Sequence, residues 1–232
     1  MHSLTAQVVI HHRTGEGCIQ QNKLFCPDWA IDNLHRYLDP TLQHLVLVTA
    51  SVLIGFTVAF SLALLSHRRR WLQPALLGAT GVLYTVPSIA FFFLLLPITG
   101  FGKDTAIIAL SAYTLQIIYR NVLAGLANVP DSVKDAARGM GLTDRQLLWR
   151  IELPLAVPEI TAGVRIATVS TVALATLAVF AGGGGLGDPL YQQIDFKTNI
   201  IIAGGLAIAM AFAFDAILLV MQRFFTPWRR AG

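Results

Sequence analysis

Charged residues are scarce in this sequence of 232 residues, since Asp, Glu, Lys and Arg together make up only 13% of it. Soluble domains carry about twice that share, so the shortage of charge excludes a soluble globular domain, and the composition also excludes a disordered chain and a coiled coil. Hydrophobic residues make up 55% of the chain. They gather in long apolar runs, which indicate an integral membrane protein.

The sequence also lacks the motifs of the common nucleotide and metal sites. A P-loop needs Ser or Thr after its Gly-Lys pair, but Lys103 is followed by Asp104. The glycines of Gly182–Gly187 match the dinucleotide fingerprint by letter. They follow an apolar run rather than a strand, so they predict a glycine-rich turn or a re-entrant loop. His11 and His12 have no third ligand at a regular spacing. We therefore expect no cofactor, no metal and no catalytic residues.

Five apolar runs predict helices that cross a membrane, which takes about 20 mostly apolar residues each. The third run is short and is expected to extend on both sides, from Lys103 to Leu126. Pro87 lies inside the second run and predicts a kink in one helix rather than two separate elements. The expected fold class is all-α, a polytopic membrane helical bundle of about five transmembrane helices. The runs are Leu45–Leu65, Leu72–Pro97, Ala106–Tyr119, Ile160–Ala181 and Ile200–Val220.

Most of the 17 Lys and Arg residues lie next to run ends on one side of the predicted bundle. That side is expected to be cytoplasmic, which places the N-terminus outside and the C-terminus in the cytoplasm of a multi-pass protein of the cytoplasmic (inner) membrane. Residues 1–41 then form an extracytoplasmic arm, residues 42–227 the transmembrane domain and residues 228–232 a cytoplasmic tail. Basic residues that set topology give no reason to expect nucleic-acid binding.

The arm has no apolar core of a signal peptide. Within Phe25–Leu42, apolar residues recur at helical spacing, which fits either an interfacial helix on the membrane or a simple polar lead-in to the first span. Cys18 and Cys26, the two cysteines of the chain, both lie in the arm. They could pair on an oxidising face, but in a sequence this hydrophobic two free thiols are the favoured interpretation.

The most informative segment is the polar stretch Asn121–Pro158, between the third and fourth runs and on the expected cytoplasmic side. It predicts two short helices joined by a turn at Gly141, a residue that can take the left-handed conformation. Asp131 is expected to cap the first helix. A helix-turn-helix held rigidly at the membrane surface offers a partner a fixed knob.

The second short helix has its own start and stop signals. Thr143 or Asp144 can cap its N-terminus. Pro154 and Pro158 are expected to end it before the membrane.

This segment resembles the EAA loop of bacterial ABC importer permeases. In that pattern an acidic residue and two alanines are followed by three residues, a glycine, nine residues and Ile-x-Leu-Pro. Asp135 stands where the family usually has Glu, which keeps the charge and shortens the side chain by one methylene. The matching residues are Asp135, Ala136, Ala137, Gly141, Ile151, Leu153 and Pro154.

The resemblance extends over roughly Leu42–Pro227 and looks most like the osmoprotectant, quaternary-amine branch of these binding-protein-dependent inner-membrane components. It implies a type I ABC importer permease for glycine betaine, choline, carnitine or a similar solute. The segments that carry it are Val86–Ala90, Leu96–Gly102, Tyr119–Asn121, Ala162–Arg165 and Gly184–Gly187.

The same resemblance implies the partners. Two cytoplasmic ABC ATPase subunits would dock on the Asp135–Pro154 loop and hydrolyse ATP, so this chain would not itself be an enzyme. A second permease subunit, identical or related, an extracytoplasmic solute-binding protein and membrane lipid complete the set. Three alternatives stay open: an importer for another small polar solute such as an amino acid, a transporter that needs no ATPase, and a membrane scaffold. The second is disfavoured because the runs show no inverted repeat.

Two charges, Arg165 and Asp215, lie about 12 Å deep within the fourth and fifth runs. An unpaired charge near mid-bilayer costs about 2.5–3.5 kcal/mol, so we hypothesise that the two form an intramembrane ion pair. A stripe of small residues on the fourth run would let another helix approach closely, within one subunit or across a dimer. The stripe consists of Gly163, Ala167, Thr171 and Ala175.

A quaternary ammonium binds the faces of aromatic rings, so an aromatic-lined path is a reasonable expectation for such a solute. Packing against lipid or other helices is the stronger explanation of these rings, and no residue is assigned to the solute. The candidates considered are Tyr84, Phe91, Phe92, Phe93 and Tyr113.

Overall fold

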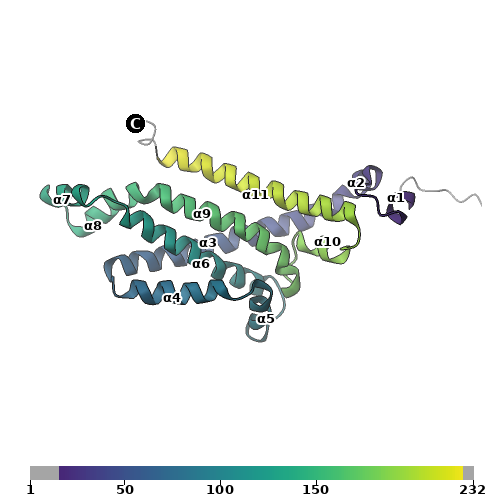
Figure 1. Cartoon of the computed structure of the whole chain (residues 1–232), viewed down its shortest axis with the longest axis horizontal. Helices are drawn as coiled ribbons and strands as arrows, with labels where there is room; N and C mark the ends of the chain where they lie inside the picture. Colours follow the sequence, from purple (N-terminus) through teal and green to yellow (C-terminus); the bar gives the residue numbers. More distant parts are fainter. Residues whose placement is uncertain (1–15, 227–232) are drawn as a thin grey trace, which may run out of the picture.

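The computed structural model describes residues 16–226, and every regular element in that range is a helix (Figure 1). The predicted all-α class is therefore confirmed. Residues 1–15 and 227–232 lie outside the described residues, and with them the histidine pair and the tail considered above. The elements are α1 Glu16–Gln20, α2 Pro27–Asn33, η1 Leu34–Tyr37, α3 Leu38–Arg68, α4 Leu72–Thr85, α5 Ser88–Thr99, α6 Lys103–Ala127, α7 Asp131–Gly139, α8 Asp144–Leu147, η2 Leu148–Glu152, α9 Leu153–Ala175, η3 Thr176–Ala181, α10 Gly187–Gln192 and α11 Lys197–Phe225.

Four of the expected spans are single helical stretches that are long and apolar enough to cross a membrane. They are Pro27–Arg68, Lys103–Ala127, Asp144–Ala181 and Lys197–Phe225. The fifth is a pair of helices, α4 and α5, which meet at an angle of 101°.

The prediction of one kinked helix across Pro87 is therefore wrong. Pro87 has no N–H to donate and holds the preceding residue out of the helical region, so Val86 is extended with ψ of 129° and the chain turns sharply. The Val86 carbonyl that the break frees accepts a hydrogen bond of 2.5 Å from the Tyr113 hydroxyl of α6. This bond satisfies a backbone group that would otherwise be unpaired at the break.

Helix α6 lies at the centre of the bundle and packs between α3 and α9, with α4 and α5 against its outer side (Figure 1). Small residues make the close contacts. A Cβ on Gly163 of α9 would lie 2.4 Å from the Cβ of Asn121, and one on Gly55 of α3 would overlap Thr114. The small-residue stripe of α9 is buried in this way, so it serves packing within the subunit rather than across a dimer.

The segment Gly182–Leu186 folds inward between η3 and α10, as the glycine pattern predicts. Gly182, Gly184 and Gly185 have positive φ, a conformation that residues with a Cβ rarely adopt. The Gly185 N–H donates to the Gln43 side chain at 3.3 Å, and the Leu186 N–H donates to Nδ1 of the buried His44 at 3.2 Å. These bonds anchor the loop to the start of α3.

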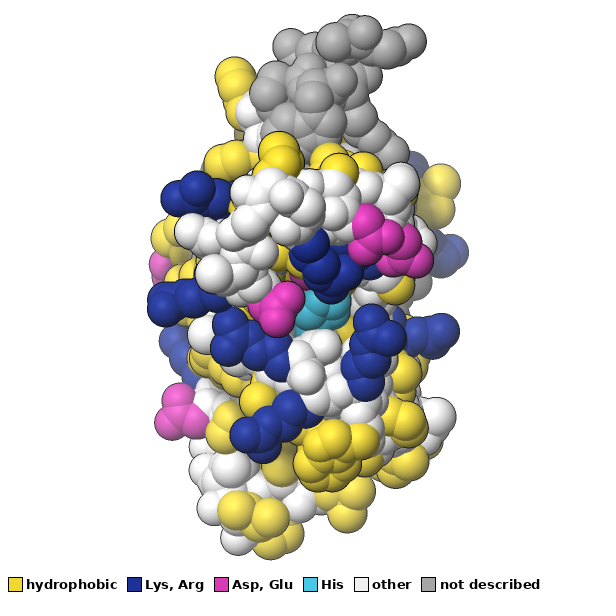
Figure 2. Space-filling view, turned by 90° about the vertical axis from the view of Figure 1, so that its left-hand side faces the viewer, with side chains coloured by type: hydrophobic (Ala, Val, Ile, Leu, Met, Phe, Trp, Pro, Cys, Tyr) yellow, Lys and Arg dark blue, Asp and Glu magenta, His cyan; other side chains and the backbone are white. Residues whose placement is uncertain are grey.

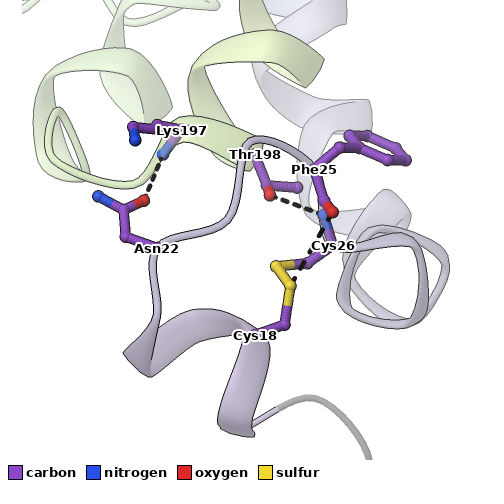
Figure 3. The surroundings of a disulfide bond; sticks show 6 residues. All are labelled: Cys18, Asn22, Phe25, Cys26, Lys197 and Thr198. Atoms are coloured by element: carbon purple, nitrogen blue, oxygen red, sulfur yellow. Dashed lines mark hydrogen bonds between the residues drawn. A yellow bond between two sulfur atoms is a disulfide. The ribbon is translucent and has the colours of Figure 1, made fainter.

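Cys18 and Cys26 form a disulfide (Figure 3), so the expectation of two free thiols is wrong. Asn22, between them, has a positive φ of 45°, which reverses the chain and leaves the two Cα atoms 5.9 Å apart. The side chain of Asn22 also accepts a hydrogen bond of 3.2 Å from the Lys197 N–H. The turn is thus held by a segment that is far away in the sequence.

The arm is fixed to the first turn of α11. The Cys26 N–H donates to the Thr198 hydroxyl at 2.9 Å, the Tyr37 hydroxyl donates to Asn199, and the Trp29 ring packs edge-on against Phe196. Helices α2 and η1 continue directly into α3. This segment is therefore a helical lead-in to the first span that is held against α11.

Candidate functional site

Helices α7 and α8 form a hairpin at one end of the long axis, opposite the end that carries α10 (Figure 1). Gly141 ends α7 with a φ of +83°. The Gly141 N–H donates to the Arg138 carbonyl at 2.9 Å, and the Leu142 N–H donates to the Ala137 carbonyl at 3.2 Å. These two bonds are the Schellman pattern of a glycine-ended helix. The predicted glycine turn is therefore confirmed.

One of the two expected caps is present. Thr143 begins α8 with a capping box, in which its hydroxyl accepts from the Gln146 N–H while the Gln146 side chain accepts from the Thr143 N–H. Asp131 does not cap α7, because Pro130 occupies the N-cap position and Asp131 already lies in the first turn. Its carboxylate instead accepts a hydrogen bond of 3.2 Å from Lys134.

The hairpin continues into the membrane helix without a break, so the prediction that Pro154 and Pro158 end the second helix is wrong. Residues Leu148–Glu152 form a π-helical turn between α8 and α9, closed by the Leu153 N–H on the Leu148 carbonyl. Pro154 then falls in the first turn of α9, where its missing N–H is not needed. Helix α8, the π turn and α9 therefore form one continuous helical stretch.

The motif residues divide between the surface and the interior of the hairpin. Asp135 and Ala136 are exposed, and the Asp135 carboxylate accepts a hydrogen bond of 3.3 Å from Arg138. The other residues of the motif, apart from Gly141, are buried or half-buried in the hairpin and at its junction with α9: Ala137, Ile151, Leu153 and Pro154.

A hollow of about 750 Å³ lies at this end of the molecule, between the end of α3 and the hairpin. Figure 2 shows basic side chains around it with a histidine among them. Five of its lining side chains are Lys or Arg, and three are acidic. The rim therefore attracts acidic groups of a partner. The basic residues are Arg68, Arg70, Lys134, Arg138 and Arg145.

In the wall of the hollow, Nε2 of His67 lies 2.9 Å from a carboxylate oxygen of Glu152. The Glu152 side chain is only 7% exposed, so this contact provides its charge with a partner. His67 lies at the end of α3 and Glu152 lies in the π turn. The pair consequently ties the α7–α8 hairpin to a second membrane helix.

Arg165 and Asp215 lie together between α9 and α11, as the hypothesis of an ion pair requires. Arg165 donates through Nε to one carboxylate oxygen and through Nη2 to the other, both at 2.8 Å. This two-pronged geometry is the strongest that Arg and a carboxylate form. Both side chains remain about one-third exposed, at 27% and 35%.

Residues 51–230 match the protein family described as the binding-protein-dependent transport system inner membrane component. This chain belongs to that family. The permease is 35% identical over 206 residues to the osmoprotectant import permease protein OsmW of Salmonella typhimurium, covering 86% of this chain and 96% of the relative. It is 33% identical over 189 residues to the choline transport system permease protein OpuBB of Bacillus subtilis, covering 81% and 87%.

Two solved structures support the fold. The MetNI methionine ABC transporter, in an inward-facing conformation, aligns with a TM-score of 0.69 and 21% identity over 79% of this chain and 95% of that chain. An amino acid ABC transporter aligns with a TM-score of 0.71 and 17% identity over 83% and 95%. The permease is thus a multi-pass inner-membrane protein with the fold of ABC transporter permeases.

The aromatic residues considered for a solute path pack mostly with one another in this permease. The Tyr113 ring makes edge-on contacts with Tyr84 and Phe91, and Phe92 is fully buried. Phe93 is half exposed on α5. Packing therefore accounts for four of the five rings.

Sequence reasoning missed two features of the permease. The His67–Glu152 pair joins residues 85 positions apart, and the signal that could have indicated it is a lone carboxylate between the apolar residues Ile151 and Leu153. It also missed Phe212, which is 71% exposed on α11 and lines the same groove as the Arg165–Asp215 pair. Its position three residues before Asp215 was the available signal.

Proposed function

We propose that this permease is the membrane subunit of an ATP-driven importer of a small quaternary-amine osmolyte, such as glycine betaine, choline or carnitine. Relatives that cover 77–86% of the chain at 33–35% identity carry choline, carnitine or osmoprotectant transport in their names, which supports this class of solute. The amino acid transporters share only the fold at 17–21% identity, so they do not favour an amino acid.

The observation that carries the proposal is the α7–α8 hairpin. It is exposed, closed by a fixed glycine turn and continuous with α9. We place it in the cytoplasm, gripped by a separate ABC ATPase, because this chain contains no P-loop. The ATPase contacts then include Asp135, Ala136 and Gly141, the exposed residues of the motif. Ala137 packs inside the hairpin, and Ile151, Leu153 and Pro154 join the hairpin to α9.

Two further features of the hairpin suit an ATPase surface. Met140, at the end of α7, and Trp149, in the adjoining π turn, are 71% and 53% exposed and offer a partner hydrophobic anchors. The basic rim of the hollow attracts acidic groups and so orients the approach of the ATPase. A partner that covered both would bury the apolar surface.

Transport then follows from the rigidity of the connections. Closure of two ATPase subunits on ATP pushes paired hairpins together, and each push reaches α9 through the π turn and α3 through the His67–Glu152 pair. Because α3 and α9 flank α6, the bundle tilts as a unit between inward-open and outward-open states.

A translocation path for the solute between two permease subunits would also account for the exposure of α11. In the most apolar 18-residue segment of α11 only 11% of the residues are buried, against 50% in that of α6. A second permease subunit, identical or related, therefore has a large surface to cover. The N-terminus lies outside in this arrangement, and an extracytoplasmic binding protein delivers solute to the end that carries α10.

The test is reconstitution of the permease in liposomes with its ATPase and its solute-binding protein. Radiolabelled glycine betaine or choline should accumulate only with internal ATP and only when the ATPase is present. Accumulation without the ATPase would establish an independent transporter. Accumulation of an amino acid such as methionine in place of both would refute the proposed solute class.

A further inference from the structure

A groove of about 660 Å³ runs between α9 and α11, and the Arg165–Asp215 pair lies in it. Apart from this pair and Ser170, its lining is apolar. Both charged residues lie well inside spans that cross the membrane, and both are about one-third exposed to the groove. Charges at such a depth face water or protein rather than lipid. The groove therefore faces water or another protein surface rather than lipid.

The ion pair leaves Arg165 able to bind a second anion. A guanidinium has five N–H groups, and Arg165 donates two of them to Asp215. Among residues 16–226, the other three have no hydrogen-bond partner. They lie along the remaining edges of a planar group whose geometry matches a carboxylate.

The same groove also offers a partner for a quaternary ammonium, the positive end of a zwitterionic solute whose carboxylate binds Arg165. Phe212 precedes Asp215 by three residues, so the two share one face of α11, and both line the groove. A quaternary ammonium has no N–H to donate. It binds through the negative face of an aromatic ring and through a nearby carboxylate.

We propose that this groove is a transient binding site for the transported solute, of the class that carries both a quaternary ammonium and a carboxylate. The solute carboxylate binds the free edges of Arg165, and its ammonium lies over the ring of Phe212 beside Asp215. The paired charges of the site and of the zwitterion both sum to zero, so no net charge is added to the membrane interior. This assignment rests on the proposed function of the permease.

The first experiment measures uptake of radiolabelled glycine betaine by the full complex in proteoliposomes. Phe212→Leu should lower uptake by about 2- to 30-fold, the range that a lost cation–π contact spans. Phe212→Tyr keeps the ring and should restore uptake. Phe224→Leu is the matched control, because Phe224 is 77% exposed on the same helix outside the groove. Equal uptake by Phe212→Leu and the control would overturn the site.

The second experiment compares two solutes. Arg165→Lys keeps the positive charge but loses the planar fork, so uptake of glycine betaine should fall several-fold more than uptake of choline, which has no carboxylate. An equal loss for both solutes would mean that Arg165 has only a structural role, and the carboxylate site would be wrong.

The third experiment uses Phe212→Cys, which introduces a single free thiol because Cys18 and Cys26 are paired. A water-soluble maleimide should label it, and glycine betaine should slow the labelling. No labelling would show a face packed against a second subunit or lipid, and would overturn the site. A wild-type complex that takes up no quaternary amine would refute the proposed function as well, whereas normal wild-type uptake with unchanged variants would refute this site alone.

Discussion

Gly141 allows a sharp test of the coupling hairpin, because a second glycine two residues away provides its own control. A Cβ added to either Gly139 or Gly141 would meet no atom within 4 Å. The two positions differ in backbone conformation, since Gly141 has a φ of +83° and Gly139 belongs to α7. Any difference between Gly141→Ala and Gly139→Ala therefore reports the left-handed turn rather than steric overlap.

The expected magnitude follows from the cost of that turn. The left-handed conformation costs a residue with a Cβ about 1–2 kcal/mol, which shifts the equilibrium between the native and the opened turn by about 5- to 30-fold. The hairpin can relieve this strain by giving up the hydrogen bonds of the Gly141 and Leu142 N–H groups. The equilibrium constant for the native turn should fall by that factor, whereas Gly139→Ala, at the last residue of α7, should be neutral or slightly stabilising.

Uptake and solute-stimulated ATP hydrolysis in proteoliposomes measure the effect. Both should fall in Gly141→Ala, by at most about 30-fold, with normal insertion of the permease and weaker binding of the ATPase. Gly141→Asn should keep most of the activity because Asn tolerates the left-handed conformation. Normal stimulated hydrolysis by Gly141→Ala, or an equal loss in Gly139→Ala, would refute the role of a rigid turn.

Three further predictions concern the end that carries α10. Reduction of the Cys18–Cys26 disulfide should destabilise the arm by about 2–3 kcal/mol and speed hydrogen exchange in α1 and α2, while a double serine variant should not respond to reductant. Gly187→Ala should prevent stable assembly, because its Cβ would lie 2.0 Å from a carbonyl oxygen of η3, whereas Gly204→Ala, with no atom within 4 Å, should melt like the wild type. Burial raises the pKa of Asp188 above its ordinary value of 3.8, so the folded state holds this proton more tightly and stability falls as pH rises through the raised pKa. Asp188→Asn should therefore raise Tm at neutral pH but not below pH 3.8, and a difference that is independent of pH would contradict this reasoning.

The sequence was most informative where the controlling physics is local. A helix across a membrane needs only a long apolar run, and a helix end needs only a glycine or a capping side chain within a few residues. Four of the spans, the Gly141 turn and the Thr143 cap could be predicted for that reason. The Arg165–Asp215 pair could be predicted too, because an isolated charge at that depth is so costly that a partner must exist.

The sequence rules failed where a neighbouring irregular turn or a distant segment decides the local conformation. Pro154 reads as a helix stop, yet the preceding π turn places it where no N–H is required. Cys18 and Cys26 read as free thiols, but the turn that joins them is held by the start of α11, about 170 residues further along the chain.

The sequence by itself determined that this protein is an all-α membrane protein, where four of its spans lie and which loop resembles a coupling hairpin. Hydropathy and helix-end chemistry depend on residues that are close together in the chain, so they can be recognised in the sequence alone. The tertiary structure alone decided that the hairpin is tied to both α3 and α9, that the arm is fastened to α11, and that Phe212 shares a groove with Arg165. Those features depend on which side chains come into contact when helices pack. Packing joins residues that are far apart in the chain, and their separation in the sequence does not predict the contact.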